Sequence, residues 1–292
     1  MPITSYQRHI QLAGASNLRD IGGYQTADGS FVRWHQVYRS GALFRFTPSC
    51  WEWVVQQDIL TVCDLRSREE RELAPTIWEG AKHTRHIGEE YDAQLLFAQG
   101  AGNGRVGLNE MHDSLYALFP TLLGASFKAM FQALMDRQVP LIVHCSAGQD
   151  RTGLAIGLLL ELLGVPREDI FRDYHLSTQW RRIENELDHQ QIRANAECNV
   201  FARFYAAVLD KRESAAFKPR VLLNRNGQPL LLDAFTAIET RWGSIPAYLE
   251  QVLGIGAEQV GRLKEHCLVS RSEYVLEGQA EASPQEKDVL PR

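Results

Sequence analysis

Short apolar runs that end in polar residues mark the first half of the chain. Residues 59–65 (ILTVCDL) and 139–144 (VPLIVH) have the length and aliphatic character of buried strands in a parallel sheet. Residues 37–40 predict a further short strand, and the Asp28-Gly29 pair predicts a hairpin turn. Together these segments predict a small, mostly buried sheet.

Helices are predicted where apolar residues recur every three or four positions. One runs from the N-cap Ser49 to about residue 58, and a charged one begins at Ser67 and stops at Pro75. A nearly all-apolar helix covers residues 153–163. Further helices are expected from about residue 114 and at residues 125–137, 169–178, 179–195, 200–212, 232–241, 246–253 and 258–268. Strands interleaved with helices, followed by helices alone, indicate the α/β class.

The composition is that of one large globular domain. The chain has 292 residues, of which 45% are hydrophobic and 23% charged, and these values exclude collagen-like, disordered and disulfide-scaffold proteins. We expect a single domain over residues 1–270, followed at residues 271–292 by a polar, disordered tail. No apolar stretch approaches the ~20 residues that a membrane span requires.

Charge and cysteine content narrow the function classes. The net charge of −5 argues against a general binder of nucleic acid or anionic membranes. The five cysteines are an odd number without paired metal-type spacing, which favours a reducing compartment over a disulfide framework. We therefore expect a cytoplasmic protein without a metal or other cofactor, with export as an effector left open. The oligomeric state stays open as well.

The segment HCSAGQDRTG, residues 144–153, lies directly between a predicted strand and a predicted buried helix. In such a loop the backbone N–H groups surround one point next to the positive end of a helix, which suits a phosphate dianion. The residues expected to line this cradle are Ser146, Ala147, Gly148 and Gln149. Arg151 can add a bidentate contact to two phosphate oxygens.

Cys145 stands at the base of this cradle, in a C-x5-R relation with Arg151. The positive surroundings favour its thiolate, a nucleophile placed under a bound phosphorus. Thr152 can donate a hydrogen bond to this sulfur, either as the thiolate or as the leaving group of the second step. The residues thus predict two-step phosphoryl transfer through a cysteinyl-phosphate. A buried structural thiol, an inactive phosphate-binding module and a rhodanese-like sulfur transferase are the alternatives.

The loop resembles the signature loop of cysteine-dependent protein tyrosine phosphatases, most closely that of atypical bacterial tyrosine/lipid phosphatases with HCxAGKDRTG. The blocks NLRDIGGY, VYRSGAL, CDLRSREER and ETRWGSIPAYL extend the resemblance over residues 14–269. It implies a mostly parallel four-stranded sheet wrapped by helices, with an inserted helical lid at about residues 176–210. It also implies a phosphomonoester hydrolase, with a phosphotyrosine protein as its expected partner.

Two departures from the family pattern affect substrate and mechanism. Gln149 stands where the family pattern has a lysine, and in the family that lysine is associated with phosphoinositide substrates. Phosphotyrosine is therefore the favoured substrate, with phosphoinositide or dual specificity as the alternative. The Trp-Pro-Asp tripeptide that carries the general acid in the wider superfamily is absent. Asp150, inside the loop, is the first candidate for this acid, and Asp113 and Asp64 are the alternatives.

Several neighbouring residues have two possible roles. Asp64 and Arg66 are expected beside the cradle as substrate-binding residues, although a helix cap or a structural ion pair would also explain Asp64. Arg66 and Arg19 can hold substrate or brace the loop. His144 is expected to orient the loop rather than transfer protons. Cys63 is expected to be a buried, inert thiol rather than a disulfide partner of Cys145.

Overall fold

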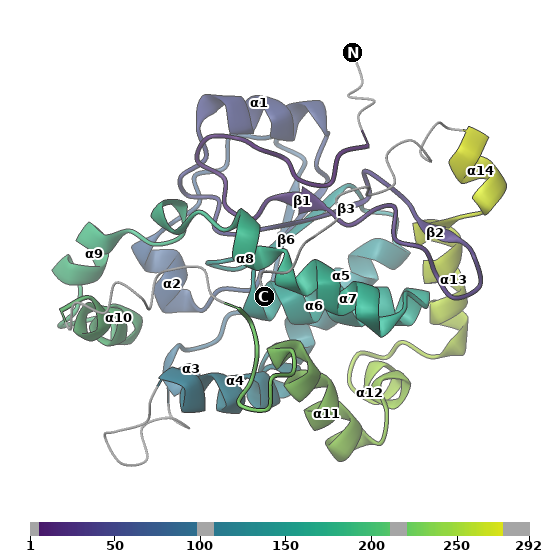
Figure 1. Cartoon of the computed structure of the whole chain (residues 1–292). Coiled ribbons are helices and arrows are strands. Elements are labelled where there is room, and N and C mark those ends of the chain that lie inside the picture. The colour runs from purple at the N-terminus through teal and green to yellow at the C-terminus, as the bar shows by residue number, and fades with distance from the viewer. Residues whose placement is uncertain (1–5, 98–107, 211–220, 277–292) are drawn as a thin grey trace.

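The computed structural model describes residues 6–97, 108–210 and 221–276 and confirms the predicted α/β class. A five-stranded sheet lies at its centre (Figure 1). Its strands, in spatial order, are β1 (Arg19–Asp20), β3 (Val37–Ser40), β6 (Leu141–His144), β4 (Thr61–Asp64) and β5 (Arg85–Ile87). The last four are parallel, and β1 adds an antiparallel edge strand beyond the four that the resemblance implies.

The predicted hairpin at Asp28-Gly29 is present. Gln25 and Phe31 pair across the turn, where Gly29 has a φ of +88°. The returning arm, β2 (Phe31–Val32), pairs with β7 (Leu268–Val269) as a separate two-stranded sheet. The hairpin therefore connects the first part of the chain to the last helices of the domain.

Fourteen α-helices and one 3-10 helix lie in the described ranges. They are α1 (Pro48–Gln56), α2 (Arg68–Leu73), α3 (Gln94–Phe97), α4 (Leu108–Leu122), α5 (Gly124–Met135), α6 (Asp150–Leu163), α7 (Arg167–His175), α8 (Ser177–Trp180), η1 (Ile183–Asn185), α9 (His189–Ala194), α10 (Val200–Asp210), α11 (Leu230–Trp242), α12 (Ile245–Gln251), α13 (Ala257–Cys267) and α14 (Arg271–Leu276).

Three local predictions were wrong. The helix expected to begin at the N-cap Ser49 has Thr47 as its N-cap and begins at Pro48, because proline suits the first helical position. The continuous helix expected at residues 179–195 is divided into the end of α8, η1 and α9, because Asp188 caps a new helix by accepting hydrogen bonds from the next backbone amides. Residues 271–276, expected to begin the disordered tail, form α14. The remaining tail residues lie outside the described ranges.

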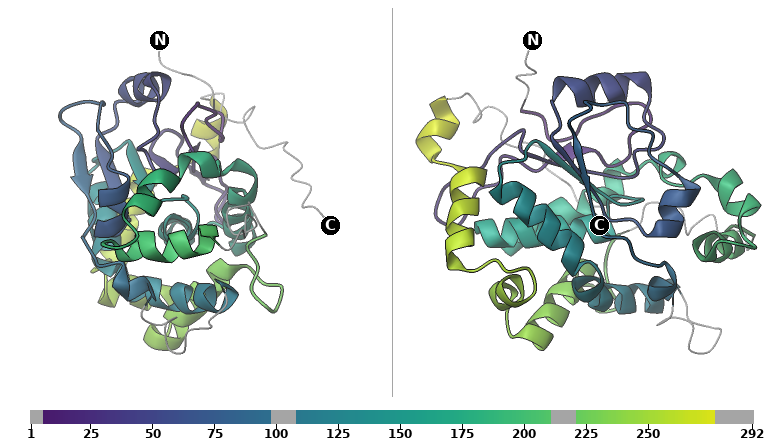
Figure 2. Two further views of the ribbon diagram at one scale, coloured as in Figure 1. Left: turned by 90° about the vertical axis from the view of Figure 1, so that its left-hand side faces the viewer. Right: turned by 180° about the vertical axis from the view of Figure 1, so that it is seen from behind.

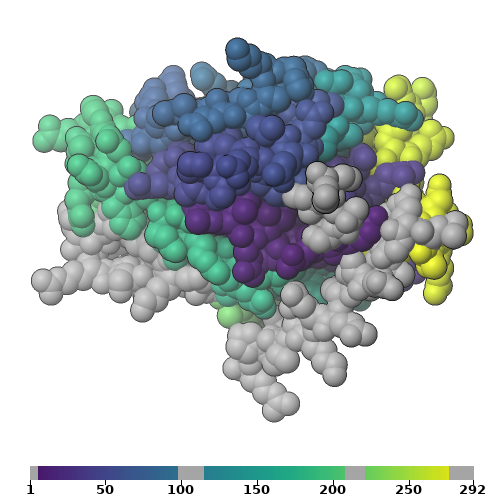
Figure 3. Space-filling view, turned by 90° about the horizontal axis from the view of Figure 1, so that it is seen from above, coloured from purple at the N-terminus to yellow at the C-terminus, as the bar shows by residue number. Residues whose placement is uncertain are grey.

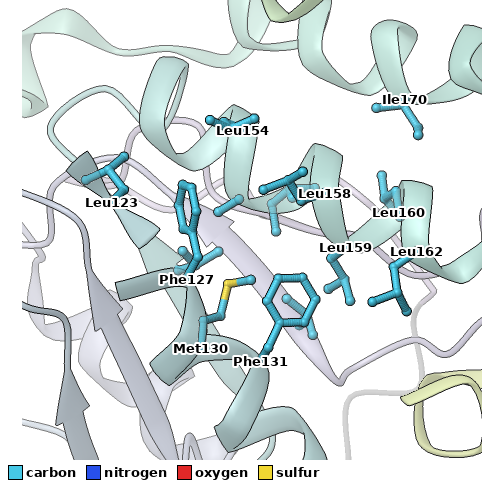
Figure 4. Packing of buried hydrophobic residues seen from close by; sticks show 14 of the residues in the cluster. Leu123, Phe127, Met130, Phe131, Leu154, Leu158, Leu159, Leu160, Leu162 and Ile170 are labelled. Carbon is cyan, nitrogen blue, oxygen red and sulfur yellow. The ribbon is translucent and has the colours of Figure 1, made fainter. Parts of the chain in front are cut away.

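The two faces of the sheet are covered by different apolar clusters, because side chains alternate along each strand. From β6, Leu141 and Val143 join a large cluster with α5 and α6, whose labelled members Phe127, Met130, Leu154 and Leu158 are seen in Figure 4. Ile142, between them, joins the opposite cluster under α1. Both faces of β6 are therefore covered, and all four of its residues are buried.

The 176–210 segment, comprising α8, η1, α9 and α10, lies at one side of the domain next to α2 (Figures 1 and 2). Figure 3 shows the molecule from above. On this face the 176–210 segment and the C-terminal helices lie at opposite ends, and α1 and the N-terminal segment lie between them. Within the described ranges no single helix could cross a membrane by length and apolarity. Residues 115–122 and α5 pass that test only as a pair bent by 57°.

Candidate active site

The loop that carries Cys145 joins the carboxyl end of β6 to the first turn of α6. Its tight path depends on Gly148, which has a φ of +63°. A Cβ atom added there would lie 2.4 Å from the Ser40 carbonyl oxygen of the neighbouring strand. A residue with a side chain is therefore excluded both by backbone conformation and by space.

Carbonyl groups of the loop are held by the surrounding chain. The Ala42 amide donates to the Ser146 carbonyl at 2.9 Å. The Asn17 side-chain amide donates to the carbonyls of Ala147 at 3.2 Å and Gly148 at 2.9 Å. These bonds turn three consecutive carbonyl groups toward the protein.

Backbone amides of the same loop are left for a ligand. Among the described residues, none accepts a hydrogen bond from the amides of Ser146, Ala147, Gly148 or Gln149. Buried amides without a partner are costly, and an anion at this point would satisfy several at once. The arrangement is the one that the predicted phosphate cradle requires.

A buried ion network supports the loop from below. Arg39 donates to the Gly148 carbonyl at 2.8 Å and forms a salt bridge with Asp173, which Arg19 also contacts at 3.3 Å. Arg19 in turn donates to Asn17, the residue that holds the loop carbonyls. Burial alone raises the pKa of Asp173, but Arg19 and Arg39 lower it well below its ordinary range. Of the two roles predicted for Arg19, bracing the loop fits this geometry.

Arg151 is fixed by Glu70, which the sequence analysis missed. The Arg151 Nη1 and Nη2 atoms donate to the two carboxylate oxygens of Glu70 at 2.6 and 2.7 Å. Nη1 also donates to the Tyr91 hydroxyl at 2.8 Å, and the Ser146 hydroxyl donates to Glu70 at 2.6 Å. The guanidinium is therefore locked in one plane before any ligand binds.

Glu70 itself is positioned by the start of α2. The Ser67 side chain accepts from the Glu70 amide, and the Glu70 carboxylate accepts from the Ser67 amide at 3.0 Å, forming a capping box. Burial raises the pKa of Glu70, but Arg151 outweighs it and lowers the pKa below its ordinary value. The S-x-x-E pattern directly after a predicted strand was the signal that could have identified this residue.

Asp150 is the first residue of α6 and lies among hydroxyl and amide donors. Its Oδ1 atom accepts from the hydroxyl of Tyr116 and from the side-chain amide of Gln149, the latter at 3.0 Å. The Tyr116 hydroxyl is in turn hydrogen-bonded to that of Tyr174. The side chain of Asp113, an alternative acid, lies outside the described residues.

Cys145 and Thr152 are both buried at the loop. The Cys145 residue is 2% exposed. The Thr152 hydroxyl is buried and has no hydrogen-bond partner among the described residues. A buried hydroxyl without a partner is costly, so Thr152 is a position where the free protein leaves a donor unsatisfied.

Comparison with known proteins agrees with this geometry. The sequence profile of the tyrosine phosphatase family matches residues 10–269. The chain belongs to the tyrosine phosphatase family. It is 30% identical to the triple specificity protein phosphatase PtpB of Mycobacterium tuberculosis, with 87% of this chain and 97% of the relative covered.

Two further relatives carry related names. A protein of Cupriavidus necator named as a tyrosine-protein phosphatase is 27% identical, with 87% of this chain and 86% of the relative covered. A tyrosine-protein phosphatase of Nostoc commune is 26% identical, with 69% and 63% covered. The chain is therefore a phosphatase, as the loop motif predicts.

Asp64 and Arg66 of this phosphatase bind each other. The Arg66 side chain is 1% exposed and donates to Asp64 at 2.8 Å and to the Ala74 carbonyl at 2.7 Å. Burial raises the pKa of Asp64, but His144, Arg66 and Arg71 lower it well below its ordinary range. An ionised, paired carboxylate is a poor proton donor, so the geometry favours the structural role for both residues over catalysis or substrate binding.

His144 and Cys63 have the inert surroundings that the sequence favoured. Burial is the main cause that lowers the pKa of His144 to about 4, so the ring is neutral at neutral pH. Its Nδ1 atom lies 3.4 Å from the Cys145 carbonyl oxygen. Burial also raises the pKa of the Cys63 thiol, which favours its unreactive form.

The 176–210 segment of the phosphatase lies against α2 and the loop of residues 144–153. Phe201 and Ala202 of α10 pack on Leu73 of α2, and the Asn199 side chain donates to the Glu69 carbonyl at 3.2 Å. Tyr205 lies within electrostatic reach of Glu70, Arg151, Asp150 and Arg181, and burial raises its pKa to about 12. The segment for which the resemblance implies a lid thus lies beside the phosphate cradle in this structure.

Proposed function

We propose that this phosphatase hydrolyses phosphotyrosine in proteins through a cysteinyl-phosphate on Cys145. The observation that carries the proposal is the bidentate contact of Arg151 with Glu70. A guanidinium already fixed in one plane beside free loop amides can bind two phosphate oxygens without losing further side-chain entropy.

In the first step the Cys145 thiolate attacks phosphorus, the bond from phosphorus to the phenolic oxygen breaks, and Asp150 gives its proton to that oxygen. In the second step Asp150 takes a proton from water as the water oxygen attacks phosphorus. The sulfur–phosphorus bond breaks, and inorganic phosphate leaves. Thr152 donates a hydrogen bond to the departing sulfur, a role for which its buried hydroxyl is available.

Two features of the site favour phosphotyrosine. Gln149 is neutral, 4% exposed and engaged with protein groups, so it supplies no cation for a second phosphate. Tyr91 and Tyr205 near Arg151 provide aromatic surface for a phenyl ring. The name of the Mycobacterium tuberculosis relative makes broader specificity, including phosphoserine, phosphothreonine or phosphoinositides, the alternative.

The first experiment measures kcat/KM on phosphotyrosine, phosphoserine and phosphothreonine peptides and on mono- and polyphosphorylated inositol lipids. We expect the phosphotyrosine peptide to be preferred at least tenfold, about 1.4 kcal/mol in transition-state binding. Cys145→Ser should abolish turnover, while the control Cys198→Ser at an exposed cysteine should not change it.

Each result has a defined meaning. Equal kcat/KM values across the panel, or a lipid preference, would contradict the phosphotyrosine assignment but not the cysteine chemistry. Turnover by Cys145→Ser would overturn the cysteinyl-phosphate. Phosphate binding without turnover of any substrate by the wild type would identify an inactive binding module.

A further inference from the structure

Gln149 connects two parts of the phosphatase that are distant in sequence. Its Oε1 atom accepts from Arg181 Nη1 at 2.7 Å, and its Nε2 atom donates to Asp150 Oδ1 at 3.0 Å. A guanidinium has donors and no acceptor, so the amide must turn its oxygen toward Arg181. The NH₂ group then necessarily faces Asp150.

Arg181 is held independently of Gln149. It forms a salt bridge with Glu186, with contacts of 2.9 and 2.5 Å from Nε and Nη2, and the two side chains are 15% and 3% exposed. The Ser16 hydroxyl donates to the same Glu186 at 2.7 Å. Burial lowers the pKa of Arg181, but Glu186 outweighs it and raises the pKa above its ordinary value. Arg181 is therefore a permanent donor in a fixed position.

The Oδ1 atom of Asp150 receives two donors, the Gln149 amide and the Tyr116 hydroxyl. A carboxyl oxygen that carries the acidic proton is itself a donor and has less capacity to accept. With two donors directed at Oδ1, the protonated form of Asp150 is more stable with its proton on Oδ2.

We propose that Gln149, oriented by Arg181, is a positioning residue that keeps the transferable proton of Asp150 on Oδ2. The proposal rests on the function proposed above, in which Asp150 is the general acid. Oδ2 would give this proton to the leaving oxygen, while Oδ1 stays bound to Gln149 and Tyr116. The 176–210 segment would then contribute to proton transfer through Arg181 without touching the substrate.

The same contact explains why glutamine rather than lysine suits position 149 of this chain. A lysine at position 149 would place an ammonium group next to the Arg181 guanidinium, and like charges at that separation repel. Glutamine accepts from Arg181 and donates to Asp150, whereas lysine could only donate. The identity of residue 149 is therefore matched to that of residue 181.

The test compares kcat/KM for dinitrophenyl phosphate, whose leaving group departs without a proton, and phenyl phosphate, whose leaving group needs one. Arg181→Met and Gln149→Leu should each lower the value for phenyl phosphate about tenfold more than the value for dinitrophenyl phosphate. The double variant should lose no more than either single one, because the two residues act in series. Arg182→Met, at the exposed neighbouring arginine, is the matched control.

Two milder variants keep the test decisive if these fail to fold. Gln149→Glu keeps a partner for Arg181 but places a negative charge beside Asp150, which should raise the pKa of Asp150. The alkaline limb of the kcat/KM profile should then move to higher pH. Gln149→Lys, which can only donate and lies next to Arg181, should be impaired toward phenyl phosphate more than toward dinitrophenyl phosphate.

The outcomes separate this proposal from the one on which it rests. If Asp150→Asn affects both substrates equally, Asp150 is not the general acid, and the positioning proposal fails with that part of the proposed function while the cysteine chemistry stands. If Asp150→Asn is selective for phenyl phosphate while Arg181→Met and Gln149→Leu are not, the general acid stands and the positioning role is overturned. An unshifted pH profile of Gln149→Glu would also overturn it.

Discussion

Buried carboxylates at the two ends of the central sheet have different partners and opposite pKa shifts. At the carboxyl ends, Glu70, Asp64 and Asp173 each contact at least one arginine, and their pKa values lie below the ordinary range although they are largely buried. At the other end of the sheet, beside the amino ends of the parallel strands, Asp20 is the last residue of the antiparallel strand β1 and accepts from the backbone amides of Gly22 and His35 at 2.7 and 2.8 Å. Its one ion-pair contact among the described residues is with the His35 ring, whose Nδ1 atom lies 3.4 Å from Asp20 Oδ2, and no arginine or lysine there forms a salt bridge with it.

The consequence is a difference in charge state. Burial dominates at Asp20 and raises its pKa to about 7, despite the two amide hydrogen bonds and the charge of Arg8. Neutral donors therefore do not compensate for lost solvation as a guanidinium does. The carboxyl ends hold fixed negative charges that orient the arginines beside the proposed phosphate site, whereas the carboxylate at the other end loses its charge near neutral pH.

The largest effect is expected from removing one of the fixed charges at the phosphate site. Glu70→Gln leaves the Arg151 guanidinium without its bidentate partner and weakens the capping box of α2. Breaking a buried ion pair by removing one member costs about 3–5 kcal/mol. We expect a loss of that size in unfolding free energy by urea denaturation, and a kcat/KM for phosphotyrosine lower by about 100-fold.

The matched control is Glu72→Gln on the same short helix, where the side chain is 60% exposed. It should change both quantities little, because exposed ion pairs contribute about 0–1 kcal/mol. Full activity of Glu70→Gln would show that Arg151 binds phosphate without a preset orientation.

An intermediate effect on the free energy of unfolding is expected at Asp20, at the opposite end of the sheet. Because the pKa of Asp20 is raised in the folded state, folding takes up a proton, and stability is lost as pH rises from about 4 to about 7. In Asp20→Asn this loss is absent. Relative to wild type, the unfolding free energy of the variant should therefore rise by about 4 kcal/mol across that window.

Urea denaturation at several pH values measures this difference, with the exposed Asp136→Asn as control. A difference between Asp20→Asn and wild type that stays constant with pH would mean that Asp20 remains ionised. The contrast between the two ends of the sheet would then be wrong.

The sequence predicted those parts of the site that are encoded locally. The apolar run of β6, the tight loop at Gly148 and the all-apolar helix α6 follow one another within 25 residues, so their order alone places Cys145 and Arg151 in a cradle. Glu70 was missed although its capping-box signal is also local.

Long-range partners were not predictable in the same way. Arg39 and Asp173 are 134 residues apart, and Asn17 lies 131 residues from the carbonyl it holds. No periodicity connects such positions, since only the tertiary fold brings them together. The contact between Gln149 and Arg181 is another long-range contact of this kind. The helix predicted at residues 179–195 would also have placed Arg181 inside a continuous helix.

The smallest effect on stability is expected at Thr152, where a substitution should slow catalysis without weakening the fold. Its hydroxyl is buried without a partner in the described part of the chain, so Thr152→Val removes an unsatisfied polar group at nearly constant volume and should leave stability unchanged or raise it by about 1 kcal/mol. The departing Cys145 sulfur would lose a donor, so dephosphorylation should slow about tenfold and a burst of leaving group should appear.

Thr84→Val is the contrasting variant, because the Thr84 hydroxyl donates to the Ile59 carbonyl at 2.7 Å. That change should cost about 1 kcal/mol of stability and leave kcat unaltered. If Thr152→Val instead behaves like Thr84→Val, the hydroxyl is structural, and the second chemical step needs no donor at this sulfur.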